Sequence, residues 1–172
     1  KAKDLVTQVK AGGWNGNLTL TCGNTPVATE LSVTIQAMLQ AAGMNITVEN
    51  LATTAQNQKV LTEGNFDIAC QGIAIFDAGP LSRMNQFASD SVRNRVGYKS
   101  PAMDAALAQL TKANSLDDTK KALGQIQTVW NTDPPAVNLY ASEWYIGMTE
   151  KVKGLRMTRD QVVMFDQSYL AK

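Results

Sequence analysis

The sequence predicts an α/β domain with an open, mostly parallel sheet, because short apolar strands alternate with amphipathic helices in its first half. Three strand patterns lie near residues 18–22, 46–51 and 66–71, separated by helical patterns at 27–42 and 53–63. Parallel neighbours need a crossover of roughly a dozen residues or more, which these helices supply. The 172 residues suit one domain, because a single core typically serves ~100 to 200 residues.

Residue periodicity and glycines set the limits of these elements. Residues 1–10 carry apolar side chains on one side and precede a glycine pair, a pattern typical of a short helix. Residues 18–22 alternate leucine with threonine, as expected for a strand. The helical pattern at 27–42 is followed by Gly43, and the one at 53–63 by Gly64, so both crossover helices have a terminating residue.

The second half of the chain predicts further helices around a polar loop. A short helix is expected over 81–87 and a loop over 88–99. Ser100 and Ser115 stand where two longer helices should begin, each ahead of apolar residues at helical spacing. The second of these helices should end before Pro134. Two later strands are expected, at 136–140 and 162–165.

Composition and residue types exclude several classes of function. Sixteen basic and fifteen acidic side chains leave a formal charge of +1, so no strong field attracts a nucleic acid. The chain has no histidine, the commonest base beside a nucleophile and the commonest transition-metal ligand. No GxSxG, HExxH, Walker or GxGxxG motif occurs. We therefore expect no nucleic-acid partner, no metal, no cofactor, no catalytic residue and no enzymatic activity.

The fold rule for open sheets places a ligand beyond the carboxyl ends of the strands. Here that edge includes the loops 23–26 and 72–80, and the second loop contains Phe76 and Asp77. These two residues have an alternative, equally supported interpretation. Phe76 would then fill the core, and Asp77 would cap the helix that begins near Leu81.

The two cysteines are expected to lie close together. Cys22 and Cys70 fall near the carboxyl ends of the first and third strands, which are neighbours in the usual doubly wound order. Two outcomes remain open. The pair forms a disulfide, which an oxidising compartment would permit, or it stays as two buried thiols that pack as small apolar groups.

Five short segments occur in an order that resembles one protein family. The most specific combines an asparagine, a glycine-tyrosine pair, a proline and an aspartate ahead of a helix, here Asn94, Gly97, Tyr98, Pro101 and Asp104. The other four lie at 1–14, 37–43, 64–67 and 126–134. Together they resemble the C-terminal lobe of cluster C solute-binding proteins, the dipeptide, oligopeptide and nickel group that serves ABC importers.

This resemblance implies a specific biological setting. The 172 residues would be one lobe, and most of the missing first lobe of the same protein would precede Lys1. The whole protein would be extracytoplasmic, either periplasmic or a membrane-anchored lipoprotein, and would deliver a peptide or other small-molecule ligand to an ABC permease. An α/β hydrolase or transferase and a stand-alone interaction module are the alternatives.

The expected ligand site combines the fold rule with the family pattern. Gly23, Asn24 and Gly72 would contribute backbone groups, while Phe76 and Asp77 would line the cleft. The sequence departs from the family here. Members often carry tryptophan directly after the third-strand glycine, where this chain has an isoleucine, and oligopeptide binders place an aspartate at the position of Phe76. Asp77 follows one residue later, so the ligand stays open between a peptide and a related solute.

Overall fold

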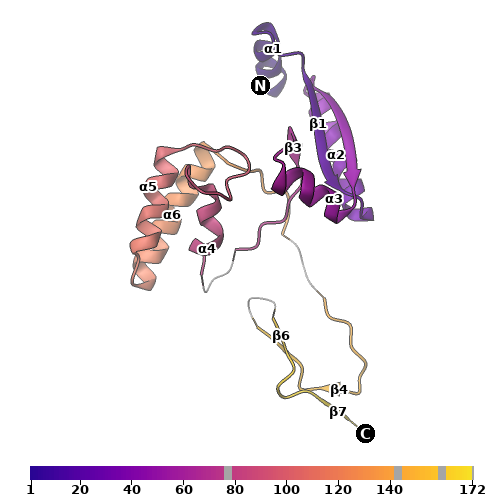
Figure 1. The fold of residues 1–172 in the computed structure, drawn as a ribbon, viewed down its shortest axis with the longest axis vertical. Coiled ribbons are helices and arrows are strands. Elements are labelled where there is room, and N and C mark those ends of the chain that lie inside the picture. Colours follow the sequence, from indigo (N-terminus) through magenta and orange to yellow (C-terminus); the bar gives the residue numbers. More distant parts are fainter. Residues whose placement is uncertain (76–78, 142–144, 159–161, 172) are drawn as a thin grey trace. The chain divides into compact units, whose positions relative to one another are not determined.

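The computed structural model describes residues 1–75, 79–141, 145–158 and 162–171. The chain divides into two compact units, Lys1–Ile73 and Ala74–Lys172. Each unit has its own elements (Figure 1) and its own hydrophobic cluster. That the 172 residues form one lobe stays a prediction.

The first unit is built on a three-stranded parallel sheet in the order β2-β1-β3. Its strands are β1 (Asn17–Gly23), β2 (Asn45–Leu51) and β3 (Ile68–Ala69). β1 and β2 pair over their whole length, from Asn17 opposite Asn45 to Gly23 opposite Leu51. The predicted α/β class, with parallel strands joined by helical crossovers, is confirmed.

The third strand is shorter than the predicted 66–71. The Thr19 amide donates a hydrogen bond to the Asp67 carboxylate at 2.7 Å. At this end of the strand pair, a side chain therefore takes the place of a backbone carbonyl as the acceptor. At the other end, the Cys70 amide donates to the Thr21 carbonyl at 2.9 Å and continues the pairing beyond Ala69. The extended segment is therefore present, although only two of its residues form a regular strand.

Both faces of the sheet in this unit are covered by helices. The helical elements of the unit are α1 (Ala2–Ala11), α2 (Pro26–Ala41), α3 (Thr53–Asn57) and the π-helix η1 (Gln58–Thr62). Leu20, Cys22 and Ile46 form a buried cluster, against which Ile35 and Leu39 of α2 pack. Strand side chains alternate between faces, so Thr21 belongs to the opposite face, which α3 and η1 cover. The predicted helix at 53–63 is thus one α-helical turn that widens into a π-helix.

The second unit is centred on two packed helices. Its helical elements are α4 (Leu81–Met84), the 3-10 helix η2 (Asn85–Phe87), α5 (Pro101–Lys112) and α6 (Leu116–Thr132). The predicted caps are confirmed: Ser100 Oγ accepts the Met103 amide and Ser115 Oγ accepts the Asp118 amide. Buried side chains of both long helices form one core with those of α4 and η2, namely Met84, Phe87, Met103, Ala106, Leu107, Leu110, Ala122 and Ile126.

The segment that carried the most specific family resemblance is a tightly bonded turn ahead of α5. The Asn94 side chain donates to the Ala88 and Tyr98 carbonyls and accepts the Tyr98 amide, at 3.2, 2.6 and 3.0 Å. Gly97 has a φ of 63°, a left-handed conformation that favours glycine. The Tyr98 hydroxyl donates to the Asp133 carbonyl at 2.8 Å, beyond the end of α6. These residues connect the loop to both long helices and therefore have a structural role.

The C-terminal part contains two short antiparallel pairs. Their strands are β4 (Val152–Lys153), β5 (Arg156–Met157), β6 (Val163–Met164) and β7 (Tyr169–Leu170). β4 pairs with β7 and β5 with β6, so the predicted strand at 162–165 is confirmed at its centre. The predicted strand at 136–140 is wrong. Val137 and Leu139 are exposed, and no strand of the described residues pairs with this segment, so its apolar alternation is not matched by burial.

Candidate ligand-binding site

The carboxyl ends of the parallel strands meet at one edge of the first unit. β1 ends at Gly23, which is half-buried, and the exposed Asn24 follows it. The segment after β3 reaches the same edge and continues to the exposed Gly72. Three of the five predicted site residues are therefore at this edge. Their contact with a ligand stays a prediction.

The two remaining predicted site residues, Phe76 and Asp77, lie outside the described residues. Both interpretations of Asp77, ligand binding and helix capping, stay predictions. The helix expected near Leu81 is present as α4, which begins at Leu81, and its N-cap residue Pro80 has no side-chain cap bond.

A disulfide joins the central strand to its neighbour at this edge. Cys22 and Cys70 are bonded, with their Cα atoms 4.8 Å apart, so the predicted proximity is confirmed and the pair does not remain as free thiols. The bond lies one residue before Gly23 and two residues before Gly72. It therefore fixes the spacing of the two backbone segments that the sequence assigns to the ligand.

A buried polar cluster fixes the end of β1. Asn50 of β2 donates through Nδ2 to the Gly23 carbonyl at 2.9 Å and to Ser32 Oγ at 3.2 Å. Ser32, on α2, is fully buried, and its hydroxyl lies 2.8 Å from the Thr29 carbonyl, to which it donates. One amide side chain thus connects the ends of two strands to the first turns of the helix between them.

A second amide side chain fixes the end of the other strand. Gln56 of α3 is buried, with 8% of its surface exposed, and its Nε2 donates to the Cys70 carbonyl at 2.6 Å. Sequence periodicity did not identify Asn50 or Gln56, because each is one polar residue inside a strand or helix pattern. Their position in the sequence could have identified them, because both lie within a few residues of the carboxyl end of the strand predicted at 46–51.

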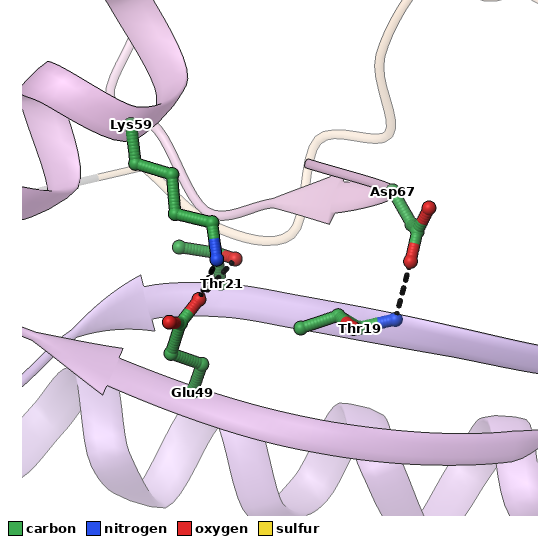
Figure 2. Close-up of polar contacts among 5 residues, drawn as sticks. All are labelled: Thr19, Thr21, Glu49, Lys59 and Asp67. Carbon is green, nitrogen blue, oxygen red and sulfur yellow. Dashed lines mark hydrogen bonds and ion pairs between the residues drawn. The ribbon is translucent and has the colours of Figure 1, made fainter. Parts of the chain in front are cut away.

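The face of the sheet beneath α3 and η1 carries a charged cluster (Figure 2). Lys59 of η1 forms an ion pair with Glu49 of β2, and Thr21 Oγ1 of β1 donates to the same carboxylate at 3.1 Å. The hydrogen bond from Lys59 is the main reason why the pKa of Glu49 lies below its ordinary value of 4.5, and partial burial opposes this shift. The cluster is well placed to hold the π-helix on the sheet.

The lowered pKa of Glu49 predicts a pH-dependent contribution to stability. A carboxyl group with a lower pKa in the folded state stabilises the protein above its unfolded value and loses this contribution as the pH falls through its folded value. Glu49→Gln should therefore reduce the unfolding free energy clearly at about pH 7 and much less at about pH 3, as measured by urea denaturation. Glu30→Gln, at an exposed position of α2, is the matched control and should have little effect at either pH. An equal loss for Glu49→Gln at both pH values would exclude this role.

Among the described residues, no helix is long and apolar enough to cross a membrane.

No protein-family model and no curated protein matches the chain. Solved structures do. The pheromone receptor PrgZ, described with its mode of peptide binding, has a TM-score of 0.78 and 19% identity over 99% of this chain. The substrate-binding domain of an oligopeptide ABC transporter from Bacillus anthracis has a TM-score of 0.77 and 14% identity over 100% of it. Listeria monocytogenes OppA, bound to peptide, has a TM-score of 0.73 and 19% identity over 100%.

This chain spans only part of each of those proteins, namely 34% of PrgZ, 35% of the Bacillus anthracis protein and 34% of the Listeria monocytogenes protein. At these identities the likeness concerns the fold. The chain has the fold of about one third of a peptide-binding solute-binding protein of an ABC transporter.

Proposed function

We propose that the chain is the ligand-binding lobe of an extracytoplasmic solute-binding protein that delivers peptides or related small solutes to an ABC importer. The observation that carries this proposal is the likeness to PrgZ, which covers 99% of the chain with a TM-score of 0.78. The carboxyl edge adds support, because a disulfide and two amide side chains hold its strand ends in place. A ligand that contacts backbone groups needs such a preformed edge.

The proposed mechanism is binding without chemistry. A ligand enters a cleft between this lobe and the first lobe of the same protein, and the two lobes then close around it by hinge motion. Closure follows from a higher affinity of the ligand for the closed form, which the permease recognises. The partners are therefore a peptide or other small-molecule ligand, the first lobe and an ABC permease.

The disulfide supports an extracytoplasmic location. Cys22 and Cys70 are bonded, and such bonds persist mainly in oxidising compartments such as the periplasm or the cell surface. Whether the protein is periplasmic or a lipid-anchored lipoprotein stays a prediction from the family resemblance.

Two other classes of function make different predictions. An α/β hydrolase or transferase would turn over its substrate, whereas the absence of histidine argues against the commonest catalytic arrangements. A stand-alone interaction module would bind no small molecule. The proposal therefore requires binding of a small ligand without its conversion.

Equilibrium dialysis against a defined pool of peptides, free amino acids and simple sugars tests the proposal. Used at a roughly millimolar concentration, which matches the weak affinity expected of a half-site, the 172-residue chain should retain peptides of two to five residues above the level of a serum albumin control, and mass spectrometry should recover them intact. Retention of no pool member would contradict a ligand-binding role. Cleaved or modified peptides would favour the enzymatic alternative.

Asp77 provides a test of the ligand's charge. If its carboxylate binds a cationic group of the ligand, Asp77→Asn should weaken peptide binding roughly ten- to a hundredfold, because a charge-assisted contact is typically worth about 1.5 to 3 kcal/mol. Asp90→Asn, at an exposed position of the second unit, is the matched control. Unchanged affinity in Asp77→Asn would favour the capping role.

A further inference from the structure

The Gln56 side chain is buried, yet only one end of its amide has a bonding partner. Its Nε2 atom donates to the Cys70 carbonyl at 2.6 Å, and 8% of the residue is exposed. A carbonyl oxygen only accepts hydrogen bonds, so the nitrogen must face Cys70 and the orientation of the amide is fixed. Within the described part of the chain, no donor reaches Gln56 Oε1. A strong acceptor is thus held in place without a partner.

The free oxygen faces a space that a glycine leaves open. A Cβ atom added to Gly23 would lie 3.4 Å from Gln56 Oε1 and 3.6 Å from the Ala28 Cβ atom. The oxygen is also not sealed inside the unit. Among the described side chains, the atom that is both fully enclosed and without a hydrogen-bond partner is Ser168 Oγ, in the other unit, and Gln56 Oε1 is not such an atom. Gln56 Oε1 is therefore not fully enclosed, and it lies beside the end of β1.

We propose that Gln56 Oε1 accepts a hydrogen bond from an N–H group of the bound ligand, in the space beside Gly23. This inference rests on the proposed peptide-binding function and makes its chemistry more specific. An amide oxygen attracts N–H donors and repels carbonyl and carboxylate oxygens, so this position selects the donor side of a peptide. Two groups share that chemistry, the α-ammonium group and a main-chain amide.

The fixed geometry explains why this contact would contribute to specificity. The Gln56 nitrogen is bonded to Cys70, and the disulfide bonds Cys70 to Cys22, so the oxygen cannot turn away from Gly23 without loss of the bond to Cys70. A buried acceptor normally has a partner, because an unmet one is destabilising. A ligand that lacks the N–H group would leave Gln56 Oε1 without a partner in a closed site, and it would bind less tightly.

The test uses tri-alanine as the probe and the 15N-labelled 172-residue chain, followed by NMR titration. Three analogues each lack one N–H group: the des-amino peptide, and the two esters in which oxygen replaces one amide nitrogen. One analogue should bind about fivefold more weakly than tri-alanine, the usual effect of one hydrogen bond. Which analogue is weakened distinguishes the ammonium group from the main-chain amides. The Gln56 side-chain amide signals should also shift during the titration.

Two variants assign this effect to Gln56. Gln56→Met keeps the size of the side chain and removes the oxygen, so tri-alanine and the sensitive analogue should bind it equally weakly. Gly23→Ala should fold, because its new Cβ atom makes ordinary contacts, but it fills the space and should weaken tri-alanine binding by at least fivefold. Gln40→Met, at an exposed position of α2, should behave like the unaltered chain.

The possible outcomes separate this inference from the proposed function. If tri-alanine shifts signals at Gly23, Asn24 or Gly72 while all three analogues bind the unaltered chain equally well, the inference fails and peptide binding stands. If Gln56→Met loses affinity but still distinguishes the sensitive analogue, Gln56 acts only through Cys70 and the inference is again overturned. If tri-alanine shifts no signal at all, both the inference and the proposed peptide ligand are contradicted.

Discussion

Replacing Cys22 and Cys70 together by serine should lower the unfolding free energy of the first unit by about 4 kcal/mol. The two cysteines are 48 residues apart in the sequence, so their bond closes a long loop and restricts the unfolded chain. Urea denaturation measures the change, followed by tryptophan fluorescence in a background where Trp130 and Trp144 are replaced by phenylalanine, so that Trp14 of this unit gives the signal.

Reduction provides the matched control for this prediction. The reduced, unaltered chain should unfold at the same urea concentration as the Cys22→Ser/Cys70→Ser variant, because both lack the bond. Alkylation of the denatured but unreduced chain gives an independent check, and it should modify neither thiol. Two modified thiols, or equal stability of the oxidised chain and the variant, would show that the bond is absent or contributes nothing.

If the chain is one lobe of a two-lobe protein, as we propose, it should bind peptide about a thousandfold more weakly than that complete protein. A micromolar complex corresponds to about 8 kcal/mol of binding free energy, and half of this leaves only millimolar affinity. The ligand would also lose the enclosure that the first lobe provides. Titration calorimetry of the chain and of the complete protein with the same peptide measures the difference. Micromolar binding by the chain itself would contradict the idea that it supplies half of the site.

The crossover pattern of the first unit was predictable because local signals agree with the fold. Leucine and threonine alternate in β1, and Leu20 and Cys22 are indeed buried on the face that α2 covers. The helix starts at Ser100 and Ser115 were equally accessible to sequence reasoning, because each hydroxyl caps a backbone amide of its own helix. Such features depend on neighbours within a few residues, so periodicity and capping residues predict them.

Features that depend on distant partners were not predictable in this way. β3 begins only after Asp67, whose carboxylate accepts a hydrogen bond from the Thr19 amide, 48 residues away. The segment at 136–140 has the alternation of a strand but no partner strand among the described residues. Alternation of apolar and polar residues shows that the side chains suit a strand. The strand forms only if a neighbouring strand offers unpaired backbone N–H and C=O groups.

The carboxyl edge of the sheet was predicted in position but not in detail. The rule for open sheets correctly placed Gly23, Asn24 and Gly72 at the carboxyl edge, because it follows from topology alone. The roles of Asn50 and Gln56 depend on which carbonyl each amide reaches, namely those of Gly23 and Cys70. Such contacts are set by the packing of α2 and α3 on the sheet, which periodicity does not specify.

The position of a bound peptide tests the central claim most directly. A tripeptide that carries a photoreactive leucine analogue, irradiated together with the chain, can be located by mass spectrometry of proteolytic fragments. Attachment should fall at the carboxyl edge, in fragments that contain Gly23 and Asn24 or Gly72, and an excess of tri-alanine should suppress it. Attachment mainly to α5 and α6 of the second unit, or labelling that tri-alanine does not suppress, would contradict a peptide site at the strand ends.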